Sequence, residues 1–449
     1  MTGDLTCGPV RAQLAALALP LLAGNILQQL YNTVDAVIVG RVAGEAAFAA
    51  VGVAGSVMNL FLFLISGGCT GMGVLLSQLN GAGDGPAFRR GCFLSALSGG
   101  GAVALLTGAG LFLLPGLLEL LRTPAEVKPY ALEYLRILFP GFLAAFAFHF
   151  GSAVLRAAGN TRAALAFLSV SMGANLVLDL LLIAALGWGV AGAAWATVAA
   201  QTLAAALCLG YLRRRFPQLV FRRADMVYDG PLLRCAARFS LVTALHMCSL
   251  YLGKLLVQRT VNGLGTAAVS AYTAAVRIEG FANSFGDSGC AAVSVFTGQN
   301  TGAGNRARVE QGFWQGQRML AAFGLFISCV LILGARPLLG LVLPRGGGES
   351  FAPALGYLRL VACFYVLNFL GSGLAGYFQG RGRVHIPVIG AAGHISFRVV
   401  CSWLLAPQMG LPAVALATGL GWLGVVVFWH VLAWRERRNA PISAAQTAR

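Results

Sequence analysis

The sequence predicts an all-α polytopic membrane protein with twelve transmembrane helices in two six-helix lobes. Three observations support this fold class: an apolar composition, twelve runs of membrane-spanning length and an internal repeat. Of the 449 residues, 58% are hydrophobic and only 10% are charged, and the mean hydropathy is +0.77. Soluble domains have about 25% charged residues. The composition therefore excludes a water-soluble globular protein.

Twelve mostly apolar runs are long enough to cross a bilayer as helices, which takes about 20 residues each. The first run continues well past the length of a signal-peptide core, so we expect it to be a retained span. In chain order the runs cover residues 14–38, 48–77, 91–114, 130–154, 163–186, 190–212, 236–261, 267–297, 313–335, 354–378, 386–405 and 412–434.

The basic residues indicate the orientation in the membrane. The net charge is +17, and the arginines form short clusters after the even-numbered runs instead of the continuous stripe that nucleic acid would require. Basic loops stay preferentially in the cytoplasm, so we expect both termini there. The ten cysteines lie scattered through apolar runs without a CxxC pair, which indicates packing thiols and no metal or redox site.

The two halves of the chain align at an offset of 221 residues, which indicates duplication. We expect lobes at residues 1–222 and 223–449. Each has an even number of spans, so both enter the membrane from the same side, as a parallel repeat with a pseudo-twofold axis along the membrane normal. Matched pairs include Gln78 and Gln299, Gly81 and Gly302, Gly159 and Gly380, and Arg162 and Arg383.

Polar residues recur on one face of three runs, at spacings of three or four. A charged residue at mid-bilayer costs about 2.5 to 3.5 kcal/mol on insertion scales, so the acids among them must face the bundle interior. This predicts a polar cleft, although the amides and hydroxyls could serve only as interhelical hydrogen bonds. The stripes are Asn25, Gln28, Asn32 and Asp35; Ser171, Asn175 and Asp179; and Glu279, Asn283 and Asp287.

Four segments resemble the multidrug and toxic compound extrusion (MATE) transporters: the first-run stretch at residues 28–41, the paired loops at 77–84 and 298–305, and residues 277–289. The resemblance spans nearly the whole chain. It implies two lobes around a central cleft that opens alternately to either side, in the bacterial inner membrane, with efflux driven by sodium or proton entry. It also implies a small-molecule substrate, no nucleic acid, and no cofactor besides the coupling ion. We expect a monomer.

The resemblance also implies a cation site at Asp35, Asn175, Asp179 and Thr197, which match the family's pattern. A sodium ion would lie at Asp35 and Asp179, or the same carboxylates would share a proton. Pro20 matches a family proline whose bending accompanies protonation. An ordinary kink is the alternative.

A second cation site of one family branch uses acids in the seventh and tenth helices, where this chain has Lys254 and Asn368. We therefore expect no such site. Lys254 or Arg277 could instead form an ion pair with Glu279, in a structural or gating role. Direct contact of Glu279 with a cationic substrate stays the alternative.

An enzyme is not expected. Residues 286–289 fit the GxSG string of intramembrane serine proteases, with Ser288 as nucleophile, but a duplicated twelve-span chain is wrong for that class. The sequence predicts a cation-coupled antiporter that exports amphiphilic, often cationic, drugs or metabolites by alternating access. The main alternative is a flippase for lipid-linked oligosaccharides, which a basic cleft would favour; a major facilitator carrier lacks its loop signature here.

Overall fold

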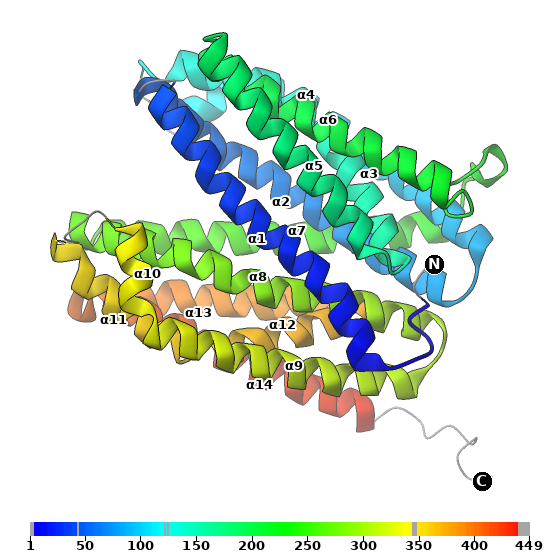
Figure 1. Cartoon of the computed structure of the whole chain (residues 1–449). Helices are drawn as coiled ribbons and strands as arrows, with labels where there is room; N and C mark the ends of the chain where they lie inside the picture. The colour runs from blue at the N-terminus through cyan, green and yellow to red at the C-terminus, as the bar shows by residue number, and fades with distance from the viewer. Residues whose placement is uncertain (1–3, 43–44, 121–122, 124, 344–347, 439–449) are drawn as a thin grey trace.

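The computed structural model describes residues 4–42, 45–120, 123, 125–343 and 348–438, with side chains except at 32–42, 45–49, 120, 437 and 438. These ranges are helical and contain no β-strand (Figure 1). The α-helices are α1 (Val10–Val42), α2 (Glu45–Gly81), α3 (Gly85–Leu120), α4 (Lys128–Ala157), α5 (Thr161–Asp179), α6 (Gly189–Arg215), α7 (Gly230–Asn262), α8 (Thr266–Gly302), α9 (Arg306–Leu333), α10 (Ala335–Val342), α11 (Phe351–Ala362), α12 (Tyr365–Gly380), α13 (His385–Met409) and α14 (Leu411–Arg438). A π-helix, Leu180–Ala185, follows α5, and short 3-10 turns occupy Arg223–Asp225 and Gly348–Ser350.

The predicted all-helical membrane fold is confirmed. Within the described ranges, ten helices are long and apolar enough to cross a bilayer, and α11 and α12 form an eleventh span with a 50° bend. Helix α8 has 37 residues, ample to cross the hydrocarbon, but its polar and charged residues keep it out of the apolar set. The twelve predicted runs thus correspond to α1 to α9, the α11 and α12 pair, α13 and α14. The tenth run, expected as one span, is divided between α11 and α12.

The described residues form two large hydrophobic cores and a small third cluster that joins α2 to α7. One is built from residues between Ala50 and Leu219, and the other mainly from residues between Val257 and Ala433. The start of α1 belongs to the second core, through Leu14 and Leu17. Helix α1 therefore bridges the lobes, and the expected boundary between residues 222 and 223 lies in the segment that joins α6 to α7.

That connecting segment is fixed to the first lobe through Asp225. Its carboxylate accepts hydrogen bonds from the Arg222 backbone amide and from Arg89 Nε of α3, both at 2.9 Å. The Arg222 amide, and then the Arg89 guanidinium, hold the pKa of Asp225 below its ordinary value. The contact therefore persists at neutral pH and weakens as acid protonates the carboxylate.

The bundle end that holds both chain termini, here called the terminal end, is closed by contacts between the two repeats (Figure 1). A Cβ atom on Gly81 would lie 1.9 Å from the Gln299 carbonyl oxygen, and one on Gly302 would lie 1.9 Å from the Gln78 carbonyl oxygen. The backbones of α2 and α8 thus touch, in a reciprocal arrangement that only glycine permits. Gln78 Nε2 also donates to the Gly380 carbonyl oxygen at 2.9 Å.

The segment before α1 lies across the terminal end and is held by Arg308 of α9. Its guanidinium donates to the carbonyl oxygens of Leu5 at 2.9 Å and Gly8 at 2.8 Å, and to Gln13 Oε1 at 2.7 Å. The Leu5 amide in turn donates to Gln299 Oε1 at 3.2 Å. The start of the chain is thereby tied to the helix end that makes the close contact with α2.

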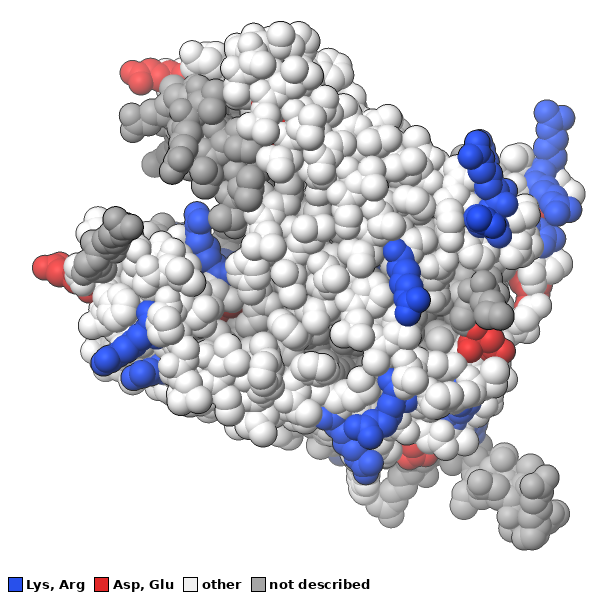
Figure 2. All heavy atoms as spheres, viewed as in Figure 1, with Lys and Arg blue, Asp and Glu red and all other residues white. Residues whose placement is uncertain are grey.

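The two lobes diverge towards the opposite end, called here the far end (Figure 1). The space-filling view shows the surface hollowed between them on that side (Figure 2). The structure is thus closed at the terminal end and open at the far end.

Leucine at Gly81 or Gly302 should separate α2 from α8, because the atom it would strike is backbone and cannot rotate away. We expect a cysteine placed at Ser77, which is 1% exposed, to react several-fold faster with a membrane-impermeant maleimide in either variant of a cysteine-free protein. Gly101→Leu is the control, because its Cβ would meet open space. Equal rates in all variants would contradict the close contact.

Candidate transport site

The first polar region lies on the buried face of α5. Asn175 and Asp179, one turn apart, are 3% and 1% exposed. The Tyr31 hydroxyl of α1 donates a hydrogen bond to Asn175 Oδ1. An amide and a carboxylate thus share a site shielded from bulk water between α1 and α5.

Local structure positions this pair. Ser171, two turns before Asp179, donates to the Ala200 carbonyl oxygen at 2.8 Å and so ties α5 to α6. Directly after Asp179 the chain continues as the π-helix Leu180–Ala185, a wider turn that often accompanies functional sites. Thr197 of α6 is half-buried and donates to the Ala193 carbonyl oxygen of its own helix at 3.0 Å. The Thr197 hydroxyl oxygen can still accept a hydrogen bond.

The remaining predicted cation ligand, Asp35, and its neighbour Asn32 lie outside the described side chains. The four-residue cation site therefore stays a prediction. Pro20 lies inside α1, which is one continuous helix, and Gln28 is half-buried.

Helix α1 also contacts the second lobe through polar side chains. Asn25 Nδ2 donates to Ser288 Oγ of α8 at 2.9 Å, and Gln29 Nε2 donates to the Gly280 carbonyl oxygen at 3.3 Å. Ser288 in turn donates to the Ser284 carbonyl oxygen at 2.6 Å. Its hydroxyl therefore ties α8 to α1, and among the described residues it bonds to no histidine.

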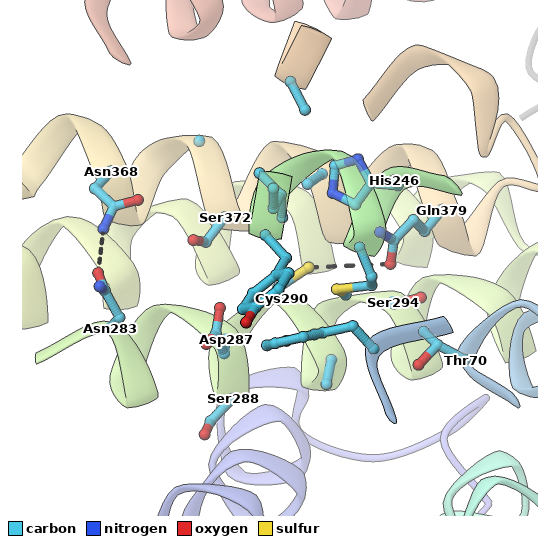
Figure 3. Close-up of a pocket in the computed structure, with 18 of the residues that line it drawn as sticks. Thr70, His246, Asn283, Asp287, Ser288, Cys290, Ser294, Asn368, Ser372 and Gln379 are labelled. Carbon is cyan, nitrogen blue, oxygen red and sulfur yellow. Dashed lines mark hydrogen bonds between the residues drawn. The ribbon is translucent and has the colours of Figure 1, made fainter. Parts of the chain in front are cut away.

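The second polar region is a cavity of about 660 Å³, within the usual size range of ligand pockets. Helices α7, α8, α12, α13 and α14 of the second lobe supply most of its wall, and α1, α2 and α4 complete it. Polar side chains from several helices converge on it (Figure 3). Asn368 of α12 donates to Asn283 of α8 at 2.9 Å. Asp287 points into the cavity between them and Cys290, and its side chain stays accessible inside the lobe.

Glu279 lines the same cavity and is 7% exposed. Tyr365, fully buried on α12, donates to its Oε2 at 3.3 Å. Arg398 of α13 is the cation that acts on this carboxylate most strongly, ahead of Lys254. The Glu279 carboxylate is thus stabilised by a hydrogen bond and by the positive charge of a base on another helix.

The expected ion pair of Glu279 with Lys254 or Arg277 is not formed. Within the described ranges, neither base places a nitrogen within 4 Å of the carboxylate. Arg277 is exposed because residues two apart on a helix point to nearly opposite sides. Lys254 lines the cavity and acts on Glu279 only at longer range.

Two bases of this region escaped the sequence analysis. Arg398 is the only charged residue (Asp, Glu, Lys or Arg) in the eleventh run, so its position alone could have marked it as a candidate site residue. Arg156 comes just after the fourth run, where basic residues are expected in a loop, but it lies in the last turn of α4 and lines the cavity.

A bundle of transmembrane helices in two lobes, with one buried polar site in the first and a large cavity in the second, defines a membrane transporter. The MatE family model matches residues 20–181 and 243–404, once in each half of the chain. The chain therefore belongs to the MATE family of multidrug transporters, as the resemblance implied.

Individual relatives agree. The chain is 28% identical to the probable multidrug resistance protein YpnP of Bacillus subtilis (strain 168) over 429 residues, 94% of each chain. It is 24% identical to the probable multidrug resistance protein NorM of Thermotoga maritima over 393 residues, which cover 85% of this chain and 82% of the relative.

Solved structures share the fold. One is described as the outward-facing conformation of a multidrug resistance MATE family transporter of the MOP superfamily, with a TM-score of 0.90. Another, a MOP superfamily transporter from Pyrococcus furiosus Vc1, has a TM-score of 0.88. Each is 22% identical, with 97% of both chains covered.

Replacing Tyr365 by phenylalanine removes the donor to the buried Glu279 carboxylate. We expect a loss of about 1.5 to 3 kcal/mol, the usual contribution of a hydrogen bond to a charged group, seen as a lower Tm in detergent. In a Glu279→Gln background the same change should lower Tm less, because the acceptor has lost its charge. Tyr228→Phe is the control, since that ring is 78% exposed. Equal losses in both backgrounds would contradict the contact.

Proposed function

We propose that the protein is a cation-coupled antiporter that exports amphiphilic, often cationic, molecules by alternating access. The observation that carries the proposal is the separation of two polar regions. Asn175 and Asp179 lie buried in the first lobe, apart from the 660 Å³ cavity formed mainly by the second. An ion and a larger substrate would thus occupy different sites in one molecule.

The first-lobe site suits the coupling ion. Asp35 and Asp179 in one pocket of low dielectric could not both stay ionised at low cost, so a proton or a cation would compensate them. Asn175 and Thr197 would add neutral oxygens, which together with carboxylates suit sodium, while the same carboxylates could share a proton.

The second-lobe cavity suits the substrate. Its walls combine polar side chains with the rings of Tyr251, Trp422 and Trp429, and pockets of this size bury most of a drug-sized molecule. Since α1 contributes Asn25 to this cavity and Tyr31 to the first-lobe site, movement of α1 would couple the two.

Asp179→Asn and Asp35→Asn should each abolish gradient-driven efflux while the protein still folds and binds substrate, because an amide can neither titrate nor balance a cation. Dye efflux is measured in inverted vesicles with sodium and pH gradients imposed separately. We expect Asp287→Asn to have a milder effect. Asp229→Asn is the control, because Asn can keep its N-cap hydrogen bond to the Leu232 amide.

If either gradient still drives the Asp35→Asn protein to concentrate dye, the assignment of the cation site to the first lobe is contradicted. The second lobe would then have to hold the coupling residues.

We also propose that the terminal end faces the cytoplasm, as the arginine distribution indicates, in the plasma membrane of a bacterium. A cysteine placed at Glu349 should be labelled by an impermeant reagent from outside intact cells, and one at Asp84 should be labelled only after permeabilisation. The reverse pattern would overturn the orientation.

A further inference from the structure

Arg398 on α13 is a base with unused hydrogen-bonding capacity on the cavity wall. Its Nη2 donates to the Tyr272 hydroxyl at 3.2 Å. Its Nε is buried and has no acceptor among the described residues, and no described carboxylate oxygen lies within 4 Å of the guanidinium. A buried donor without an acceptor is costly, and adjacent guanidinium donors match the two oxygens of a carboxylate or phosphate.

Lys254 on α7 faces the same cavity from the neighbouring helix. Helices α7 and α13 pack closely there: a Cβ on Gly253 would lie 2.8 Å from the Ile395 side chain. Lys254 follows Gly253, and Arg398 lies almost one turn after Ile395. Both side chains line the cavity, so two bases converge on it from adjacent helices.

The repeat places these two bases on the helices that are equivalent to α1 and α5. At the offset of 221 residues, Asp35 and Asp179 correspond to Leu256 and Val400. Lys254 and Arg398 each lie two residues before those positions. The second lobe thus has two bases on the helices that correspond to those carrying the two acids of the proposed cation site.

Bases outnumber acids among the described residues that line the cavity. Arg156, Lys254 and Arg398 are the bases there, and Glu279 and Asp287 are the acids. Within the described ranges none of the five has an oppositely charged partner within 4 Å. Glu279 already accepts from Tyr365. A bound anion would restore neutrality where the dielectric is low.

We propose that the second-lobe cavity binds its substrate through an anionic group, a carboxylate or a phosphate, held between Arg398 and Lys254. The apolar body of the substrate lies against Trp422 and Trp429 of α14. This inference rests on the proposed function and narrows it: the exported amphiphile carries an anionic group, alone or beside a cationic one.

The test is equilibrium binding to the full-length protein in phosphatidylcholine nanodiscs, followed by tryptophan fluorescence. The probes share one ring system and differ in charge: 1-naphthyl phosphate, 3-(1-naphthyl)propionate and 2-(1-naphthyl)ethylammonium. We expect the two anions to bind more tightly than the cation. Arg398→Gln should weaken anion binding about tenfold or more, as loss of a charge-assisted hydrogen bond predicts, and should leave or improve cation binding.

Three further variants keep the result interpretable. Lys254→Gln should weaken anion binding less than Arg398→Gln, and Arg398→Lys should restore part of the affinity, because it returns the charge without the fork of donors. Arg277→Gln is the control: it removes the same charge from an exposed position outside the cavity wall and should change nothing. Tighter binding of the cation, or anion binding that neither Arg398→Gln nor Lys254→Gln weakens, would overturn the proposal.

Two sources of the anionic group are separable in the same assay. If a lipid headgroup is the natural ligand, phosphatidic acid added to the nanodisc should displace 1-naphthyl phosphate; if the ligand is a soluble amphiphile, it should not. No ion gradient enters this measurement, so a failure of coupled efflux and a failure of anion binding are distinguishable.

Discussion

The cost of an ionised side chain in hydrocarbon governs where this chain can place its few charges. Each charge at mid-bilayer costs about 2.5 to 3.5 kcal/mol on insertion scales, so a helix tolerates one only on an inward face. Asp179 meets this condition through burial between helices, and Glu279 through the Tyr365 hydroxyl and the field of Arg398. These two acids lie at two separate interior sites.

The two repeats share the glycine contacts that close the terminal end, but they differ in the charged residues of their interior. At the terminal end, Gly81 and Gly302 permit the same close backbone approach in both repeats, so α2 and α8 cross almost symmetrically. The interior residues of the two repeats differ. Helices α1 and α5 carry Asp35 and Asp179, whereas the equivalent positions of α7 and α13 are apolar and their bases, Lys254 and Arg398, lie two residues earlier. A symmetric closure combined with unlike interior sites suits a molecule that moves two different solutes through one conformational change.

The spans and the repeat could be predicted because they depend on local composition and on matches in one frame. The buried face of Asn175 and Asp179 also followed from helical spacing. Partners across helices could not be predicted in this way. Spacing placed Asn25 on the same face as Asp35, but its amide bonds to Ser288 of the other lobe. The sequence offered Lys254 or Arg277 as the partner of Glu279, whereas the base with the larger electrostatic effect on this carboxylate is Arg398, more than a hundred residues away in the chain. The 50° break between α11 and α12 could not be predicted, because residues 363–364 contain no proline or glycine.

Transport by alternating access would require the terminal end to open and close. Ser77 and Gly298 meet there, with a Cβ on Gly298 expected 2.8 Å from that of Ser77, so a small shift would allow a disulfide between cysteines at these positions. The most direct measurement is efflux by the Ser77→Cys/Gly298→Cys protein in a cysteine-free background, before and after reduction. The account predicts that the oxidised protein binds substrate but does not export it, and that reduction restores export. Full export by the oxidised protein would contradict it.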